Sequence, residues 1–319
     1  AARSLWHSTR TATSPQYGAY GEQHGRRTQH TALVALACRQ HRRTPHQRRT
    51  LYMAVDMAKT LMHTLSARLD WLWRVLATGH CFALLFGGGF LLAISALPVT
   101  RWFGRTPEEK DERARRLIHH TFRFYLWQMQ ALGLMTLVIR GREHLAQARG
   151  KLVVANHPSL LDVVILISLL PDCDCIVKGS LRRSLVSGVI RATGYTDNSN
   201  GDLMLARSSR SLAAGFPLIV FPEGTRSIPG EPLVFQRGAA NIAIRCNADV
   251  LPALITADPP TLLKGEPWYK IPPRRPVFTI TFFPAITTQD YADKAVSPAL
   301  ATRQFNRFLL DFFQQQLQH

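Results

Sequence analysis

The chain has 319 residues, 46% of them hydrophobic, and a formal net charge of +18. This length suffices for one sizeable domain with appended segments, and the charge favours an anionic partner such as a membrane surface, a phosphorylated substrate or nucleic acid. The sequence contains no dinucleotide glycine fingerprint and no P-loop, and its five cysteines fit no zinc-ligand spacing. We therefore expect reduced thiols in a protein that faces the cytosol.

Residues 1–52 hold nine arginines against one acidic residue, Glu22, and have little apolar periodicity. We expect this basic extension to be disordered. Its composition resembles that of a transit peptide, but the first methionine is Met53, and translated upstream sequence or a cloning remnant is the interpretation that we favour.

Residues 53–134 are predicted to form a membrane-anchoring helical region. Between Val75 and Thr100 there is no aspartate, glutamate, lysine or arginine, and a helix of this length spans about 39 Å, enough for a bilayer core. The glycine triplet at 87–89 and Pro98 weaken the helix, so a re-entrant segment is the alternative. Basic residues follow the apolar segment, which places the rest of the chain in the cytoplasm.

The segment Pro107–Leu134 is predicted to be an amphipathic helix, charged in its first half and rich in aromatic residues in its second. Two interpretations stay open at this point. The helix either packs on the following domain or lies in the membrane interface.

From residue 135 to 319 short apolar runs alternate with helical patterns, which predicts an α/β domain with a mostly parallel central sheet flanked by helices. We expect strands at 135–140, 151–155, 173–177, 218–221, 250–255 and 277–283. We expect helices at 158–170, 182–192, 201–214, 235–246 and 296–316. The proline-rich stretch 256–276 is expected to be irregular.

A histidine follows the second predicted strand, in the sequence Asn156-His157-Pro158-Ser159-Leu160-Leu161-Asp162. Positions five apart differ by about 140° in a regular helix. His157 must therefore lie at or before the first helical turn for Asp162 to reach it. Such a pair forms the base and the orienting carboxylate of a triad without a protein nucleophile, and it would activate a substrate hydroxyl. The alternative is a structural histidine that caps the helix.

The fourth predicted strand ends at Pro222 and is followed by Glu223-Gly224-Thr225-Arg226-Ser227. Gly224 allows close approach of a ligand to the backbone, and Arg226 can bind a phosphate through two hydrogen bonds. In an open α/β sheet, ligands bind outside the carboxyl ends of the strands. We expect His157 and the segment 223–226 to meet there; a polar turn with a surface ion pair is the alternative.

Together these segments resemble the glycerolipid acyltransferase family, which includes the 1-acylglycerol-3-phosphate acyltransferases. Residues 156–162 look like the first sequence block of that family, and residues 221–227 closely match the third. Residues 194–197 and 250–255 stand in the places of the second and fourth blocks, so the resemblance covers about residues 135–283.

The resemblance implies a membrane-bound O-acyltransferase. His157 would be the general base and Asp162 its orienting partner. The substrate would be held by Glu223, Gly224, Thr225 and Arg226, with Lys178 as a further cation. The acyl donor would be a thioester of coenzyme A or acyl carrier protein, the acceptor a lysophospholipid such as 1-acylglycerol-3-phosphate, and no metal or further cofactor is expected.

The second block departs from the family pattern, because Asn198 stands where many relatives have an arginine. Arg191, Arg207 and Arg210 are candidates to supply the missing charge. The departure allows a different lipid-like acceptor. Two other classes are less favoured: a non-catalytic lipid-binding relative, and a nucleic-acid-binding protein, for which the sequence shows no recognition motif.

Overall fold

The computed structural model describes residues 45–180, 187–294 and 297–318. By its internal contacts the chain divides into two compact units, residues 1–69 and 70–319. In the first unit, the described residues belong to helix α2 (Pro45–Ala83), which continues into the second unit. Residues 45–52 are helical, whereas the sequence predicted disorder up to residue 52; residues 1–44 lie outside the described part of the chain.

A seven-stranded sheet forms the centre of the second unit, with the strand order β1-β7-β6-β2-β5-β3-β4. Neighbouring strands are parallel except for β6 and β7, which are antiparallel. The strands are β1 (Thr136–Arg140), β2 (Leu152–Ala155), β3 (Asp174–Val177), β4 (Thr196–Asp197), β5 (Leu218–Val220), β6 (Val250–Asp258) and β7 (Val277–Phe282). The predicted α/β class with a mostly parallel sheet is confirmed.

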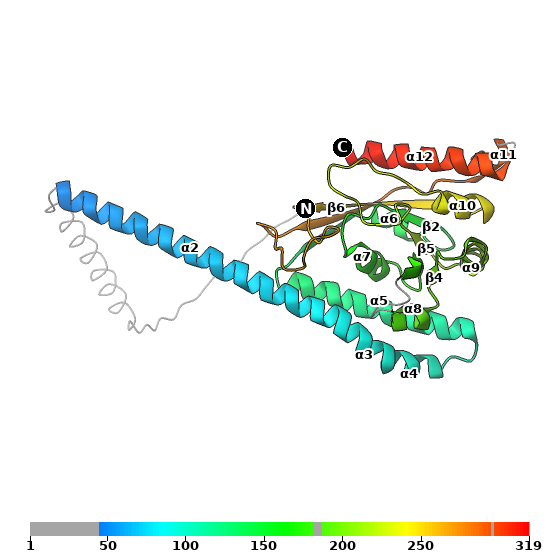
Figure 1. The fold of residues 1–319 in the computed structure, drawn as a ribbon, viewed down its shortest axis with the longest axis horizontal. Helices are drawn as coiled ribbons and strands as arrows, with labels where there is room; N and C mark the ends of the chain where they lie inside the picture. The colour runs from blue at the N-terminus through cyan, green and yellow to red at the C-terminus, as the bar shows by residue number, and fades with distance from the viewer. Residues whose placement is uncertain (1–44, 181–186, 295–296, 319) are drawn as a thin grey trace, which may run out of the picture. The chain divides into compact units, whose positions relative to one another are not determined.

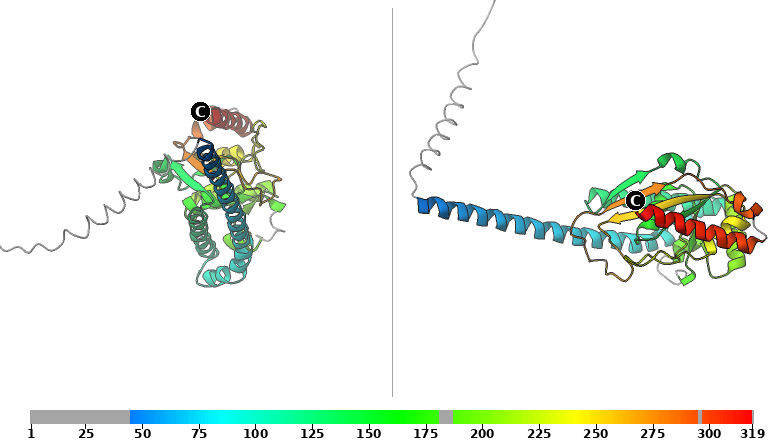
Figure 2. Two further views of the ribbon diagram at one scale, coloured as in Figure 1. Left: turned by 90° about the vertical axis from the view of Figure 1, so that its left-hand side faces the viewer. Right: turned by 90° about the horizontal axis from the view of Figure 1, so that it is seen from above.

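Helices cover both faces of this sheet, so the unit has three layers (Figures 1 and 2). On one face lie α5 (Pro107–Ala131), α7 (Asp162–Leu169) and α8 (Ser187–Thr193). On the other lie α9 (Gly201–Ala213), α10 (Gly238–Arg245) and α12 (Pro298–Gln318). Strand β2 is buried on both sides: Val153 and Ala155 pack in the first layer, and Leu152 and Val154 in the second. Two-sided burial explains why the strand sequences are continuous apolar runs.

The apolar segment between residues 75 and 102 is helical with two interruptions. After α2 come a π-helical turn, η1 (Leu84–Gly88), and the short helices α3 (Gly89–Ile94) and α4 (Ala96–Trp102). The π turn coincides with the glycine triplet, and the break at Ser95 precedes Pro98, so the predicted weakening of the helix is confirmed. Among the described residues, one helical stretch, Arg49–Trp102, is long and apolar enough to cross a membrane.

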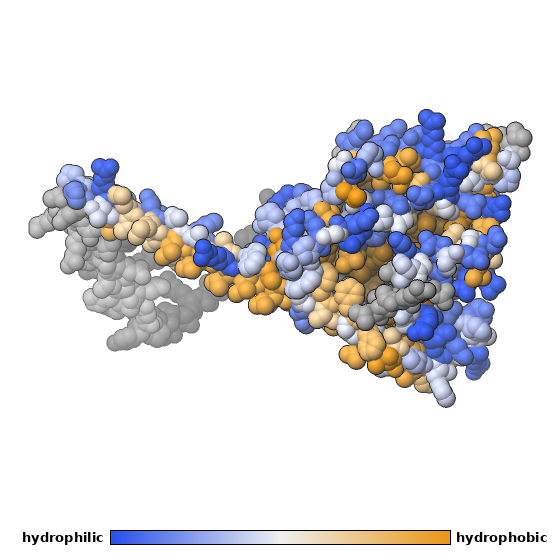
Figure 3. All heavy atoms as spheres, in the orientation of Figure 1, coloured by the Kyte–Doolittle hydropathy of each residue, from blue (hydrophilic) through white to orange (hydrophobic). Residues whose placement is uncertain are grey.

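Helix α5 packs on the domain, which is one of the two interpretations left open by the sequence; its position in the membrane interface stays a prediction. One face is buried, including Ile118, Tyr125 and Met129, and packs against α7. On the other face Phe124 and Trp127 are exposed, by 57% and 62%. Apolar side chains also lie on the surface over α3 and α4 (Figure 3).

The element boundaries differ from the predicted ones in a few places. Strand β4 and the helices α6 (Arg142–Leu145) and α11 (Gln289–Lys294) were not predicted. Helix α7 begins at Asp162 and not at Pro158. The difference places His157 in a loop at the carboxyl end of β2, five residues before the helix.

Candidate active site

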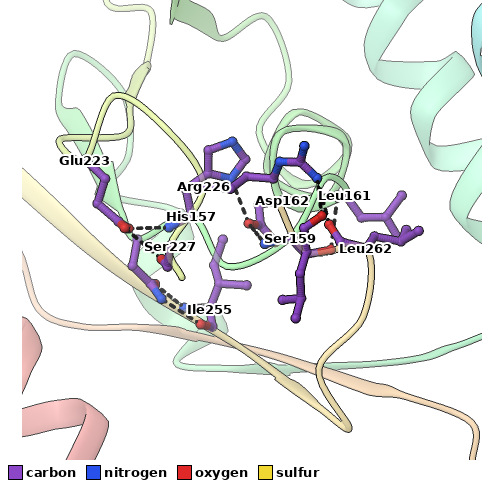
Figure 4. Close-up of polar contacts among 11 residues, drawn as sticks. His157, Ser159, Leu161, Asp162, Glu223, Arg226, Ser227, Ile255 and Leu262 are labelled. Carbon is purple, nitrogen blue, oxygen red and sulfur yellow. Dashed lines mark hydrogen bonds and ion pairs between the residues drawn. The ribbon is translucent and has the colours of Figure 1, made fainter. Parts of the chain in front are cut away.

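His157 and Asp162 form a hydrogen-bonded pair at the carboxyl end of β2 (Figure 4). The distance between His157 Nδ1 and Asp162 Oδ2 is 2.8 Å. The Asp162 side chain is fully buried, whereas the imidazole is 17% exposed. Because a carboxylate can only accept a hydrogen bond, Nδ1 carries a proton, and in the neutral imidazole Nε2 then has a free lone pair. The expectation that the two side chains meet before the first helical turn is therefore confirmed.

The Asp162 carboxyl is held by a second hydrogen bond as well. The backbone N–H of Ser159 donates to Asp162 Oδ2 at 2.7 Å. Burial raises the pKa of this carboxyl, and the hydrogen bonds from His157 and Ser159 oppose the rise. The loop 157–161 is thus folded around the carboxylate at the start of α7, which explains why helical structure begins only at Asp162.

Three contacts with the segment that follows β5 fix the position of His157. Its imidazole packs on the Phe221 ring, with 4.4 Å between the ring centroids. Its backbone N–H donates to Glu223 Oε1 at 2.7 Å, and its carbonyl oxygen accepts from the Ser227 N–H at 2.7 Å. The two sequence motifs therefore meet at neighbouring strand ends, as the sequence predicted.

Glu223 is engaged with protein groups on both of its carboxylate oxygens. Besides the His157 N–H, it accepts a hydrogen bond from the Ser227 hydroxyl to Oε2 at 2.7 Å. Burial raises the pKa of the Glu223 carboxyl, and these two hydrogen bonds oppose the rise. Glu223 thus holds the loop that carries His157, one of the two roles that the sequence left open for it, the other being a partner of Arg226.

Arg226 lies in the same loop but reaches towards the proline-rich stretch. Its Nη1 donates to the carbonyl oxygens of Leu262 and Leu263, at 2.8 and 3.0 Å. The Leu262 carbonyl also accepts from the backbone N–H of Leu160, at 3.3 Å. Within the described part of the chain, Nε and Nη2 of Arg226 make no hydrogen bond. The Arg226 guanidinium therefore holds the loop at Leu262 and Leu263 through Nη1, and its Nε and Nη2 are available to bind a ligand.

The other predicted binding residues lie at the same edge of the sheet. Gly224 has a left-handed backbone, with φ of +67°, and both it and Thr225 are exposed. Lys178 is exposed directly after β3. Asn198, the departure in the second block, follows β4, and its Oδ1 accepts a hydrogen bond from the Gly179 N–H at 3.0 Å. The carboxyl ends of four neighbouring strands thus lie along one edge of the sheet.

The three arginines considered as substitutes for the arginine that Asn198 replaces do not lie at the His157 site. Arg191, Arg207 and Arg210 line a cavity with Asp174, Thr196 and Phe216. Asp174 and Thr196 are the first residues of β3 and β4, and Phe216 precedes β5. Because these strands are parallel to β2, the cavity opens at their amino ends, opposite the end that carries His157. The idea that these arginines supply the missing charge at the His157 site is therefore wrong.

Comparisons with known proteins point to one family. Residues 136–256 match the model of the family described as Acyltransferase. The chain is 28% identical over 232 residues to mouse 1-acyl-sn-glycerol-3-phosphate acyltransferase alpha, covering 70% of this chain and 77% of the relative. It is 28% identical over 188 residues to the human alpha protein, and the match covers 56% of this chain and 63% of the relative. It is 31% identical over 155 residues to a Chlamydomonas reinhardtii 1-acyl-sn-glycerol-3-phosphate acyltransferase, where the match covers 44% of this chain and 45% of the relative.

Among solved structures, the fold matches the crystal structure of the 1-acyl-sn-glycerophosphate (LPA) acyltransferase PlsC from Thermotoga maritima. The TM-score is 0.57 at 21% sequence identity, and the match covers 79% of this chain and 98% of the other. At this identity the likeness concerns the fold. It supports the arrangement of sheet and helices described above.

The domain that carries the His157 site is accordingly an acyltransferase domain, and the protein is an O-acyltransferase. Within this class, the relatives that it resembles are 1-acyl-sn-glycerol-3-phosphate acyltransferases, in line with the resemblance carried by the first and third sequence blocks.

Proposed function

We propose that the protein transfers a fatty acyl group from an acyl thioester to the free hydroxyl of a lysophospholipid, with 1-acylglycerol-3-phosphate as the expected acceptor. The observation that carries the proposal is the 2.8 Å contact between His157 Nδ1 and the buried Asp162, which leaves Nε2 available as a base. The pair lies in the domain matched by the acyltransferase family. The names of the related enzymes supply the expected acceptor.

In the proposed reaction, His157 Nε2 takes the proton of the acceptor hydroxyl as its oxygen attacks the thioester carbonyl carbon. An ester C–O bond forms, and the C–S bond breaks as the tetrahedral intermediate collapses. The imidazolium then returns its proton to the leaving thiolate, so base and acid are restored. Asp162 stabilises the transient imidazolium and keeps Nδ1 protonated. No acyl-enzyme is formed.

The acceptor phosphate is proposed to bind beside this base. Arg226 offers Nε and Nη2, and exposed Lys178 offers an ammonium at the end of the neighbouring strand. The exposed Gly224–Thr225 backbone allows close approach of the lipid. Charged hydrogen bonds to a phosphate would orient the acceptor hydroxyl towards His157.

The acyl donor is proposed to be a thioester of coenzyme A or of acyl carrier protein. The chemistry assigned to His157 and Asp162 needs no metal and no further cofactor. The donor thioester is a co-substrate, because its thiol is released in each turnover.

Membrane association is proposed through the apolar segment and the neighbouring surface of the domain. The candidate span Arg49–Trp102 is long and apolar enough to cross a bilayer. Exposed apolar residues continue over α3, α4 and α5, among them Phe90, Trp102 and Trp127. Basic residues after the span favour a catalytic domain that faces the cytoplasm.

The test is an acyl-transfer assay with the full chain in nanodiscs. Labelled acyl-CoA and acyl carrier protein thioesters are offered with a panel of lysophospholipids. His157→Ala should lower turnover by about 10²–10⁴-fold. His120→Ala, which removes an exposed histidine on α5, should leave turnover unchanged. Full activity in His157→Ala would refute the mechanism.

Asn198 gives a specific reason to consider a different lipid-like acceptor, because it stands in place of a cation and bonds to Gly179. Transfer to 1-acylglycerol-3-phosphate would show that this departure does not exclude the usual acceptor. Transfer only to another lysolipid would keep the mechanism and reassign the substrate. No transfer by a folded protein with any donor would favour a non-catalytic lipid-binding relative.

A further inference from the structure

A second polar cavity lies at the amino ends of β3, β4 and β5, at the opposite end of the strands from His157. Its volume is about 430 Å³, within the range of small-molecule binding sites. The three residues of β5 span about 10 Å, at roughly 3.3 Å per residue, so the amino and carboxyl ends of this strand are at least that far apart. Helices α5, α8 and α9 contribute its walls.

Five guanidinium groups and four carboxylates line the cavity. Two of the arginines are engaged with the protein. Arg101 bonds to Asp111, and Arg115 lies 3.5 Å from Asp174, donates to the Thr193 carbonyl and packs over the Phe216 ring. These contacts use two of the four carboxylates.

The other three arginines have no such partner. Arg191 from α8 and Arg207 and Arg210 from α9 make no hydrogen bond or ion pair within the described residues, and all three are exposed. Of the two remaining carboxylates, Asp197 already bonds to Ser199, and Glu108 lies in the first turn of α5, where the helix N-terminus favours a negative charge. Three cations thus converge on one cavity without a matching set of anions.

Two residues of the cavity wall, Tyr195 and Thr196, are buried, and their hydroxyl oxygens are closed off from solvent. The groups that the cavity offers to a ligand are therefore the three guanidinium groups.

We propose that this cavity is a binding site for a phosphate-bearing ligand, separate from the acyl-transfer site. A phosphate group offers several acceptor oxygens to neighbouring guanidinium groups at once. A metal cation would be repelled by the arginines, and an apolar molecule would leave their charges without a partner. The volume has room for an organic group attached to the phosphate. The ligand source is either a soluble phosphate compound or a lipid head group.

Binding is measured on the full chain in detergent, by calorimetry and by the ligand-induced shift in melting temperature. One arm uses pyrophosphate and glycerol 3-phosphate as soluble probes. The other uses phosphatidylcholine nanodiscs with and without phosphatidic acid. Binding in either arm supports the proposal and identifies the source when the double arginine variant described next weakens it, because the proposed acyl-transfer site also binds phosphate.

Two variants test the assignment. Arg207→Gln combined with Arg210→Gln should weaken binding about 10-fold or more. Arg303→Gln on α12 also removes an exposed arginine, one that does not line the cavity, and should bind like wild type.

Acyl transfer without added probe separates this site from the proposed active site. The double arginine variant should keep wild-type transfer within about twofold, because the two sites lie at opposite ends of the strands. Loss of transfer together with binding would overturn the proposal of a separate site. Equal binding by the double variant and Arg303→Gln, or no binding in either arm, would overturn the site itself.

Discussion

Glu223 Oε1 accepts a hydrogen bond from the backbone N–H of His157 at 2.7 Å, across 66 positions of sequence. The contact joins the loops after β2 and β5, which are neighbouring parallel strands. The Glu223 carboxylate therefore acts on His157 through the His157 backbone and does not contact the imidazole ring. It is a positioning residue, and its removal should affect the geometry of the site.

Replacing Glu223 separates this positioning role from direct binding of substrate. Glu223→Gln keeps an acceptor oxygen for the His157 N–H and should lower kcat about 10-fold. Glu223→Ala leaves that N–H without its partner and should lower kcat about 10²-fold or more. Acyl transfer measured over a range of substrate concentrations gives kcat and KM for both variants. We expect the change to fall mainly on kcat. A predominant increase in KM, equal in the two variants, would indicate a substrate-binding role instead.

The raised pKa of Glu223 predicts a pH dependence of stability. Burial lifts the pKa of this carboxyl above its ordinary value of 4.5. The folded protein then holds the proton to a higher pH than the unfolded chain. Its stabilising effect is complete below the ordinary pKa and is lost as pH rises through the raised pKa. The free energy of unfolding of wild type relative to Glu223→Gln should therefore fall with rising pH in this window. Urea unfolding at several pH values measures it, and an increase would contradict the sign.

Asp162→Asn tests the negative charge behind the imidazole. The asparagine carbonyl oxygen can still accept hydrogen bonds from His157 Nδ1 and the Ser159 N–H, which both reach Oδ2 in wild type, but the charge that stabilises the imidazolium is lost. Turnover should fall by about 10²–10⁴-fold while the fold is retained, because the buried site loses a charge and keeps its shape. Circular dichroism provides the folding control. Near wild-type turnover would exclude a role for the Asp162 charge in the reaction.

Arg226→Lys tests whether the arginine holds the proline-rich loop. A lysine keeps the charge but lacks the planar fork that reaches both the Leu262 and the Leu263 carbonyls. Cleavage after Lys264 or Lys270, both exposed, should become about 10-fold faster in limited proteolysis. Arg303→Lys is the matched control on α12. Unchanged cleavage would show that Arg226 does not hold the proline-rich loop and that only its positive charge matters.

Gly224→Ala tests the left-handed turn that follows β5. The nearest atom to an added Cβ would be Gln236 Cγ at 3.9 Å, so space is available, but the φ of +67° is unfavourable for alanine. We expect a loss of about 1–2 kcal/mol in the free energy of unfolding. Gly238→Ala, at the start of α10 where nothing lies within 4 Å, should be tolerated. An equal effect at both positions would argue against backbone strain.

Much of the fold could be predicted because the local patterns agree with the tertiary structure. Six of the seven strands lie within one or a few residues of the predicted runs, since strands buried on both faces must be continuously apolar. Strand β4 has only two residues, too few for a pattern. The start of α7 was predicted too early, because Asp162 accepts the hydrogen bond from the Ser159 N–H and keeps residues 158–161 out of the helix.

The sequence by itself determined the α/β class, the apolar segment and the pairing of His157 with Asp162, because each depends on residues close together along the chain. The tertiary structure decided what the neighbouring polar groups do. Glu223 meets the His157 backbone, and Arg226 meets carbonyls 36 and 37 positions away. Arg207 and Arg210 lie at the other end of the strands. Strand order and direction fix these placements, and residue spacing alone contains neither.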